Sequence, residues 1–374
     1  MTLRGYKVSL YKNPATMSKI QKVYETKEIS YKGALGEGRI RVDDVTGDMA
    51  SAVRGAKYIL VMVAAIAHNS VARELAAHVE PGQIVFVLPG TFGALTFHQE
   101  LKALGKDNIV AETHTLPYAV RLSGEGEVTV MSRFNPLKLG VIPATKTDVA
   151  AAAFSELYDG VEPVESVVAC GLSSLNPIIH VPGCVLNAGR IEYAGQPFFY
   201  YTEGFSDCVV RTTIQLDDER RALLSAFGYA SDIVAHGVGK SDDLKEAVAG
   251  NPSFARISVP PSFKYRYFTE DIPFGIAVWA KLAHQIGVSV PIMDAMVTLG
   301  SCIMNSWFLP IQGKYKTTTQ KNMISVGKRQ KRKHVVQHIL RFLLRREQTP
   351  TGLCQRERKG TVAVLLLMEL ALSA

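Results

Sequence analysis

Short runs of apolar and β-branched residues alternate with amphipathic stretches over the first 147 residues of the chain. The apolar runs cover residues 6–11, 58–63, 84–88 and 108–111. The amphipathic stretches between them, with the spacing of helices, cover residues 46–56, 67–79 and 94–105. Strands that alternate with helices of this length are typical of right-handed βαβ units and a parallel sheet. The pattern therefore predicts an α/β domain over residues 1–147.

From about residue 148 the pattern changes to longer helical stretches that are punctuated by proline and glycine. These stretches cover residues 147–157, 178–188, 204–226, 243–249, 274–287 and 291–307. Apolar positions at intervals of three and four residues are typical of amphipathic helices. The sequence therefore predicts a second, all-α domain over residues 148–313, and a length of 374 residues accommodates both domains.

The basic charge of the chain is concentrated in its last part. Residues 314–374 carry 14 Lys and Arg and three Glu, which leaves 28 of the 42 basic and 31 of the 34 acidic residues in the preceding part. The body is therefore slightly acidic and gives no electrostatic reason to expect nucleic acid. Residues 314–374 are interpreted as an appended, poorly ordered tail outside the working fold. A short basic helix on an anionic surface is the functional alternative.

Neither a membrane segment nor a metal site is expected. The opening residues lack the apolar core of a signal peptide, and the late apolar run over 361–374 includes Glu369 and is shorter than the roughly 20 residues of a spanning helix. The five cysteines form no close pair and no CxxC motif. We therefore expect a soluble, cytoplasmic protein in a reducing compartment, without a structural metal.

A parallel sheet binds its ligands at the carboxyl ends of its strands, and dinucleotide-binding sheets add a G-x-G-x-x-G turn. The cluster Gly33, Gly36 and Gly38 has a different spacing and is predicted to be a loop. Residues 2–11 resemble the end of the first helix and the second strand of a Rossmann dinucleotide-binding domain. The first strand and its phosphate-binding turn are therefore expected to be missing, so that this Rossmann domain is incomplete.

The candidates for holding a cofactor are the residues that follow the predicted strands. They are Lys12, Asn13, Val63, Ala64, Ala65, Pro89 and Gly90. After the second strand, an acidic residue suits the ribose hydroxyls of NAD and a basic one suits the extra phosphate of NADP. Lys12 favours NADP, although a lone exposed lysine is also ordinary surface. Both NAD and NADP stay open.

Two segments of the predicted helical domain carry acid–base chemistry. Asn176 and His180 are four residues apart, so a helix that begins at Pro177 places them on one face. Arg266 and Asp271 precede an apolar helix. Asp271 could orient His180, and Arg266 could grip a substrate carboxylate. The alternatives are an ordinary buried histidine and acids that complement a helix dipole.

These segments resemble the octopine/nopaline (opine) dehydrogenase family. The resemblance rests on Asn176-Pro-x-x-His180 and Arg266-Tyr-Phe-Thr-Glu-Asp271-Ile-Pro-Phe-Gly275, and extends over about residues 2–312. It implies a Rossmann domain followed by a helical domain. It also implies a catalytic pair, His180 and Asp271, with Arg266 on the carboxylate of the oxo acid and Asn176 beside the reacting centre.

The resemblance implies an NAD- or NADP-dependent oxidoreductase that reductively condenses an amino acid with a pyruvate-like 2-oxo acid. These small molecules are the expected partners, and the protein is expected to be a monomer or homodimer. Two alternatives remain. A glycerol-3-phosphate or 2-oxoacid reductase shares the architecture, and an incomplete paralogue would be inactive.

Overall fold

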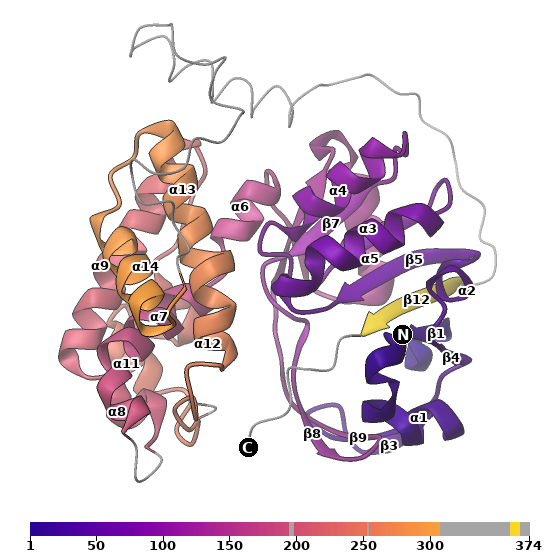
Figure 1. The fold of residues 1–374 in the computed structure, drawn as a ribbon, viewed down its shortest axis with the longest axis horizontal. Helices are drawn as coiled ribbons and strands as arrows, with labels where there is room; N and C mark the ends of the chain where they lie inside the picture. The colour runs from indigo at the N-terminus through magenta and orange to yellow at the C-terminus, as the bar shows by residue number, and fades with distance from the viewer. Residues whose placement is uncertain (194–197, 253, 307–359, 367–374) are drawn as a thin grey trace, which may run out of the picture. The chain divides into compact units, whose positions relative to one another are not determined.

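The computed structural model describes residues 1–193, 198–252, 254–306 and 360–366, which form two compact units (Figure 1). The first unit contains residues 1–173 together with 360–366, and the second begins at Ser174. The predicted α/β domain followed by an all-α domain is confirmed. The units divide after Ser173 rather than after residue 147, because helices α5 (Thr147–Leu157) and α6 (Val167–Leu172) pack on strand β10 of the first unit.

The first unit is built on an eight-stranded sheet. Its strands in spatial order are β11 (Val161–Pro163), β10 (Leu137–Ile142), β7 (Val110–Thr113), β6 (Ile84–Val87), β5 (Ala56–Met62), β12 (Thr361–Leu366), β1 (Lys7–Tyr11) and β4 (Asp44–Thr46). All neighbours are parallel except β10 and β7. Read from β4 to β7, this arrangement is the 3-2-1-4-5-6 strand order of dinucleotide-binding domains, with β12 in the first position.

Strand β12 corrects two expectations at once. Residues 361–366 belong to the segment interpreted as an appended tail, yet they pair with β1 on one side and with β5 on the other. The side chains of Val362, Ala363, Val364 and Leu365 are buried. A strand covered on both faces reads as a continuous apolar run, which this segment is. The position predicted to be empty is therefore filled. Apart from Gly360, the rest of residues 314–374 lies outside the described residues.

The helices of this unit and a second sheet complete its fold. The helices and helical turns are η1 (Thr2–Arg4), η2 (Pro14–Ile20), α1 (Gln21–Thr26), α2 (Met49–Val53), η3 (Ala65–Ala67), α3 (His68–His78), α4 (Gly93–Ala103) and η4 (Ala144–Lys146). The second sheet has the order β3 (Gly38–Arg41), β2 (Glu28–Gly33), β9 (Glu127–Arg133) and β8 (Tyr118–Gly124). The cluster of Gly33, Gly36 and Gly38 forms the turn between β2 and β3, which belong to this second sheet and not to the large one.

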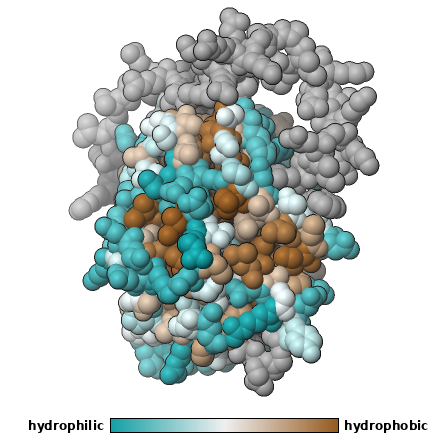
Figure 2. Space-filling model, turned by 90° about the vertical axis from the view of Figure 1, so that its left-hand side faces the viewer, coloured by the Kyte–Doolittle hydropathy of each residue, from teal (hydrophilic) through white to brown (hydrophobic). Residues whose placement is uncertain are grey.

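The second unit is a bundle of helices. They are α7 (Asn176–Leu186), α8 (Ala188–Glu192), η5 (Tyr200–Gly204), α9 (Asp207–Ala226), α10 (Val234–Val238), α11 (Leu244–Ala249), α12 (Arg266–Thr269), η6 (Asp271–Ile276), α13 (Ala277–Ile286) and α14 (Pro291–Ile303). Both η5 and η6 are π-helical turns, a form that is frequent at functional sites. On the face in Figure 2, apolar side chains lie among hydrophilic ones, and Ile214 and Leu299 are among the exposed apolar residues of this unit.

One described segment, Val167–Leu186, has the length and apolar composition of a membrane span. It comprises α6 and α7, and 83% of its most apolar window is buried inside the structure. Core helices of folded domains have the same composition and the same burial. The segment is therefore weak evidence for a membrane span.

Candidate active site

His180 and Asp271 form a buried hydrogen-bonded pair in the helical unit. His180 lies in the middle of α7, and Asp271 is the first residue of η6. Their side chains meet with Nδ1 of the imidazole 2.7 Å from Oδ2 of the carboxylate, and both residues are at most 5% exposed. Because an ionised carboxylate can only accept, the proton of neutral His180 lies on Nδ1. The lone pair of Nε2 is then left for a reacting group.

Gly275 explains how η6 comes close enough to α7. A Cβ atom on Gly275 would lie 2.6 Å from Cγ of Pro177, far inside van der Waals contact. Pro177 is the second residue of α7, where proline is well tolerated because no intrahelical bond to its nitrogen is needed. The two residues let the π-turn pack against the first turn of α7, and Asp271 then reaches His180.

The surroundings of the pair favour the uncharged imidazole. The ring of Tyr267 stacks on His180, with centroids 3.6 Å apart and an angle of 13° between the planes. Burial lowers the pKa of His180, the carboxylate of Asp271 opposes that shift, and the charge of Arg266 adds to it. The lowered pKa favours a neutral His180 that is able to take a proton.

Arg266 and Asn176 belong to the same unit. Arg266 is half-buried at the start of α12, and its guanidinium carbon lies 5.2 Å from the centre of the Tyr267 ring. Asn176 is half-buried at the first position of α7, one helical turn before His180. The structure thus places a cation next to the aromatic ring that covers the imidazole. Tyr267 was not predicted as a site residue.

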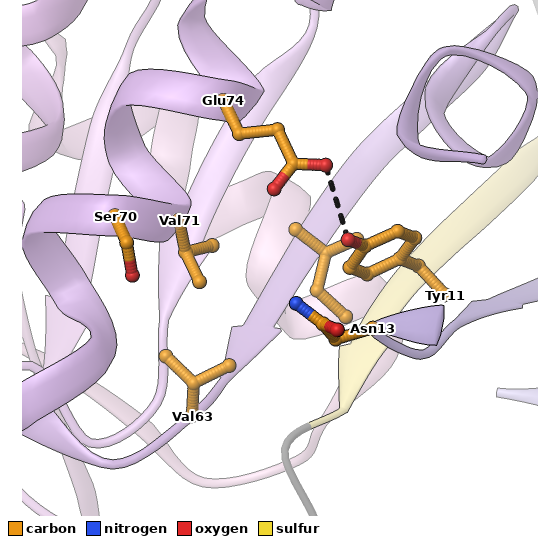
Figure 3. A pocket seen from close by; sticks show the side chains of 7 residues that line it. Tyr11, Asn13, Val63, Ser70, Val71 and Glu74 are labelled. Carbon is orange, nitrogen blue, oxygen red and sulfur yellow. Dashed lines mark hydrogen bonds between the residues drawn. The ribbon is translucent and has the colours of Figure 1, made fainter. Parts of the chain in front are cut away.

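A pocket lies at the carboxyl edge of the large sheet, where the strand order reverses between β12 and β5 (Figure 3). Residues from three strand ends and from helix α3 line it: Tyr11, Asn13, Val63, Ser70, Val71, Glu74 and Leu365. The Tyr11 hydroxyl donates a hydrogen bond to Glu74 Oε1 at 3.0 Å. Such a reversal is where open α/β sheets bind their ligands. Two of the predicted cofactor residues, Asn13 and Val63, are therefore in a suitable position.

Lys12 is placed differently from the prediction. Its side chain is 0% exposed, whereas its neighbours Tyr11 and Asn13 line the pocket. Successive residues of a strand point to opposite faces, so Lys12 points away from the pocket. It would have to leave a buried position to meet a cofactor phosphate. Lys12 therefore does not favour NADP, contrary to the expectation from the sequence.

A carboxylate outside the predicted set holds the turn that follows β6. Thr91 and Phe92 of this turn both have left-handed backbone, with φ of 46° and 65°, which strains residues other than glycine. Glu112 at the end of β7 is fully buried and accepts hydrogen bonds from the N–H groups of Phe92 at 3.2 Å and Ala94 at 2.9 Å. It caps the N-terminus of α4 and stabilises the strained turn.

Glu112 also accounts for Gly90, one of the predicted cofactor residues. A Cβ atom on Gly90 would lie 2.2 Å from Cβ of Glu112, so only glycine fits there. Burial raises the pKa of Glu112 to about 7, although the two backbone hydrogen bonds oppose the shift. The half-buried Pro89 precedes this turn, and Ala64 and Ala65 form the corresponding turn after β5. Both turns lie at carboxyl ends of parallel strands.

These turns and the pocket lie at the carboxyl edge of the sheet, where open α/β sheets bind their ligands. The glycine-rich cradle for the pyrophosphate has no counterpart among the described residues. Residues 367–374, which follow β12 in the sequence, contain no glycine and lie outside the described residues.

Comparison with known proteins agrees with this architecture. Residues 163–304 match the family model for the α-helical domain of NAD/NADP octopine/nopaline dehydrogenase. The chain is 30% identical to an opine dehydrogenase of Arthrobacter sp. (strain 1C), over 82% of this chain and 87% of that protein.

Solved structures of octopine dehydrogenase and of yersinopine dehydrogenase share the fold. Octopine dehydrogenase with NADH and L-arginine superimposes with a TM-score of 0.66 at 18% identity, covering 80% of this chain and 90% of that one. NADP⁺-bound yersinopine dehydrogenase gives a TM-score of 0.66 at 14% identity, covering 80% and 85%. The predicted family is confirmed: the chain belongs to the NAD(P)-dependent octopine/nopaline (opine) dehydrogenases and is an oxidoreductase.

Proposed function

We propose that His180 and Asp271 carry the acid–base chemistry of this opine-type enzyme. The chain is an NAD(P)H-dependent oxidoreductase that joins the amino group of an amino acid to a 2-oxo acid and reduces the product. The observation that carries the proposal is the 2.7 Å contact between Nδ1 of His180 and the carboxylate of Asp271 in a buried setting.

The pair works by moving one proton at Nε2 of His180. The neutral imidazole accepts a proton there from the amine or the oxygen centre and returns it later in the cycle. Asp271 keeps the proton of neutral His180 on Nδ1 and stabilises the imidazolium while it exists. The reduced nicotinamide, when bound, supplies the hydride, and that chemistry belongs to the cofactor.

Arg266 binds the carboxylate of the 2-oxo acid in this proposal. A guanidinium can bind a carboxylate through two parallel hydrogen bonds, which fixes the orientation of the bound acid as well as its position. Asn176 is the supporting polar group on the same helix as His180. In this assignment the carboxylate of the 2-oxo acid is bound from α12, by Arg266, whereas proton transfer takes place on α7, at His180.

We further propose that NADH is preferred over NADPH. The pocket at the strand ends presents the Glu74 carboxylate, which accepts from the Tyr11 hydroxyl and has a second oxygen for a ribose hydroxyl. A carboxylate repels the additional phosphate of NADPH, and Lys12 is buried away from the pocket. Asn13 does not offset this repulsion, because its side chain carries no charge and caps η2 through the N–H of Ala15.

The cytoplasm is the proposed location. Among the described residues, Cys170, Cys184, Cys208 and Cys302 are all free thiols, which suits a reducing compartment. A monomer or homodimer is the proposed assembly.

The decisive experiment is oxidation of NADH by pyruvate in the presence and absence of a panel of amino acids. An opine dehydrogenase requires the amine, so NADH oxidation should start only when an accepted amino acid is added. Reduction of pyruvate without any amine would instead support a 2-oxoacid reductase. No oxidation with any amino acid at millimolar NADH would support the inactive alternative.

A further inference from the structure

Tyr200 is a buried residue that contacts the backbone of the helix carrying His180. It is 0% exposed and begins the π-turn η5. Its hydroxyl lies 2.9 Å from the carbonyl oxygen of Ile179 and 2.7 Å from that of His180, and it shares its one proton between these two acceptors. A side chain thus holds the peptide group of the proposed acid–base residue itself.

Two residues of α7 make room for this contact. A Cβ atom on Gly183 would lie 2.0 Å from the Tyr200 hydroxyl oxygen, so any larger residue would displace it. Pro182, within the helix, has no N–H with which to continue the regular bonding. Helix α7 runs on through Pro182 with one intrahelical bond fewer, so contacts from outside the helix add to what holds its backbone here. The Tyr200 hydroxyl provides one.

Tyr200 also contacts the aromatic ring that covers the imidazole. Its ring meets His180 edge-on at 6.4 Å between centroids and meets Tyr267 edge-on at 5.7 Å. The stack of Tyr267 on His180 fixes the plane of the imidazole, and Tyr200 borders both rings. The side chain of Tyr200 therefore contacts both the backbone and the ring of His180.

We propose that Tyr200 is a positioning residue that fixes the direction of His180 Nε2 through the His180 carbonyl and the Tyr267 ring. The inference rests on the proposed acid–base role of His180. Displacement of a catalytic group by about 1 Å can cost up to 10²-fold in rate. Loss of the hydroxyl, which leaves the rings in place, should lower kcat by about tenfold. The KM for NADH should not change.

The test compares Tyr200→Phe with Tyr158→Phe. Tyr158 is an equally buried tyrosine of the first unit whose hydroxyl also donates to two carbonyls, those of Pro117 and Phe134. We expect the kcat per folded enzyme to fall only in Tyr200→Phe, with a shifted pH profile of kcat. The imidazole NMR signals of His180 should change in Tyr200→Phe and not in Tyr158→Phe. Gly183→Ala should reproduce the effect because it displaces the hydroxyl.

Three results would overturn the proposal: a parental kcat and pH profile in Tyr200→Phe, an equal fall in both variants, or unchanged His180 signals. Measuring His180→Ala in the same assay distinguishes a failure of the positioning role of Tyr200 from a failure of the acid–base role of His180. If His180→Ala is inactive while Tyr200→Phe is unaffected, the positioning role is wrong and the acid–base role stands. If His180→Ala retains parental turnover, the acid–base role is wrong, and the NMR signals still report whether Tyr200 holds the ring.

Discussion

Nδ1 of His180 lies 2.7 Å from the carboxylate of Asp271, although 91 positions separate the two residues in the sequence. Neither residue is exposed enough for water to screen the contact. A hydrogen bond to a buried carboxylate determines which nitrogen of the imidazole carries the proton, and therefore which nitrogen can react. The amide in Asp271→Asn could instead donate to the ring and reverse that choice.

We therefore expect Asp271→Asn to lower kcat by roughly 10²-fold or more, and His180→Ala to do the same. Asp294→Asn is the matched control, because Asp294 makes an exposed contact of 3.0 Å with His284 in the same unit. This control should keep parental turnover in the assay with NADH, pyruvate and an accepted amino acid. Near-parental rates in both site variants would show that the acid–base pair is assigned wrongly.

Glu112→Ala should weaken the binding of NADH. It leaves the buried N–H groups of Phe92 and Ala94 without their acceptor, at about 1–3 kcal/mol each, and the strained turn relaxes. We expect the KM for NADH to rise about tenfold, and less in Glu112→Gln, which keeps an acceptor oxygen.

The control is Glu219→Ala in the helical unit. Glu219 caps α14 in the same way, accepting from the N–H groups of Ile292 and Met293 at 2.7 and 2.8 Å. Glu219→Ala should therefore lower the stability of the protein without changing the KM for NADH. A parental KM in Glu112→Ala would exclude the role of Glu112 in shaping the cofactor turn.

The Glu74 carboxylate should determine the choice of cofactor. We expect kcat/KM to be at least about tenfold higher with NADH than with NADPH, which corresponds to about 1.4 kcal/mol. Glu74→Gln removes the negative charge and should narrow that ratio, whereas Glu100→Gln on α4 should not. A preference for NADPH in the parental enzyme would contradict the reasoning from Glu74.

Acid should destabilise the protein through His68. Burial lowers the pKa of His68 to about 4 from 6.5, despite a hydrogen bond to the backbone of Val63. Between pH 6.5 and 4 the unfolded chain binds a proton that the folded state does not, so the free energy of unfolding falls as the pH falls, by up to about 3 kcal/mol. His114, with a pKa also lowered to about 4 by burial, acts in the same window.

His68→Gln should flatten this dependence, measured as the free energy of unfolding in urea at pH 7 and pH 5. His78→Gln, an exposed position on the same helix, is the control and should leave the dependence as it is. An unchanged slope in His68→Gln would assign the acid sensitivity to other groups.

Local patterns in the sequence were sufficient for much of this fold. The runs at 58–63 and 84–88 correspond to β5 and β6 because buried parallel strands are continuous in apolar residues. The motifs around His180 and Asp271 were both predicted to lie in the helical domain. In the structure they lie on α7 and η6 of that unit. The burial of Lys12 was not foreseeable, since strand alternation only places it opposite Tyr11, and both residues are buried.

Long-range pairing could not be predicted in the same way. The run at 361–366 looks like a strand, but nothing within it indicates that it pairs between β1 and β5. Similarly, an acid after an apolar run marks Glu112 as unusual, while its acceptance of hydrogen bonds from Phe92 and Ala94 depends on the path of a turn some 20 residues earlier. The stack of Tyr267 on His180 likewise exists only after two helices have packed.

The central place of β12 also sets an order for events during synthesis. Residues 361–366 leave the ribosome after every other strand of their sheet. Until then β1 on one side and β5 on the other present open edges where β12 will lie. Domains near the N-terminus usually fold while the rest of the chain is still being made. In this protein the sheet of the dinucleotide-binding domain cannot be completed until β12 has been synthesised. Until then its unpaired strand edges can pair with other chains, so correct folding requires that the nascent chain be protected from such contacts.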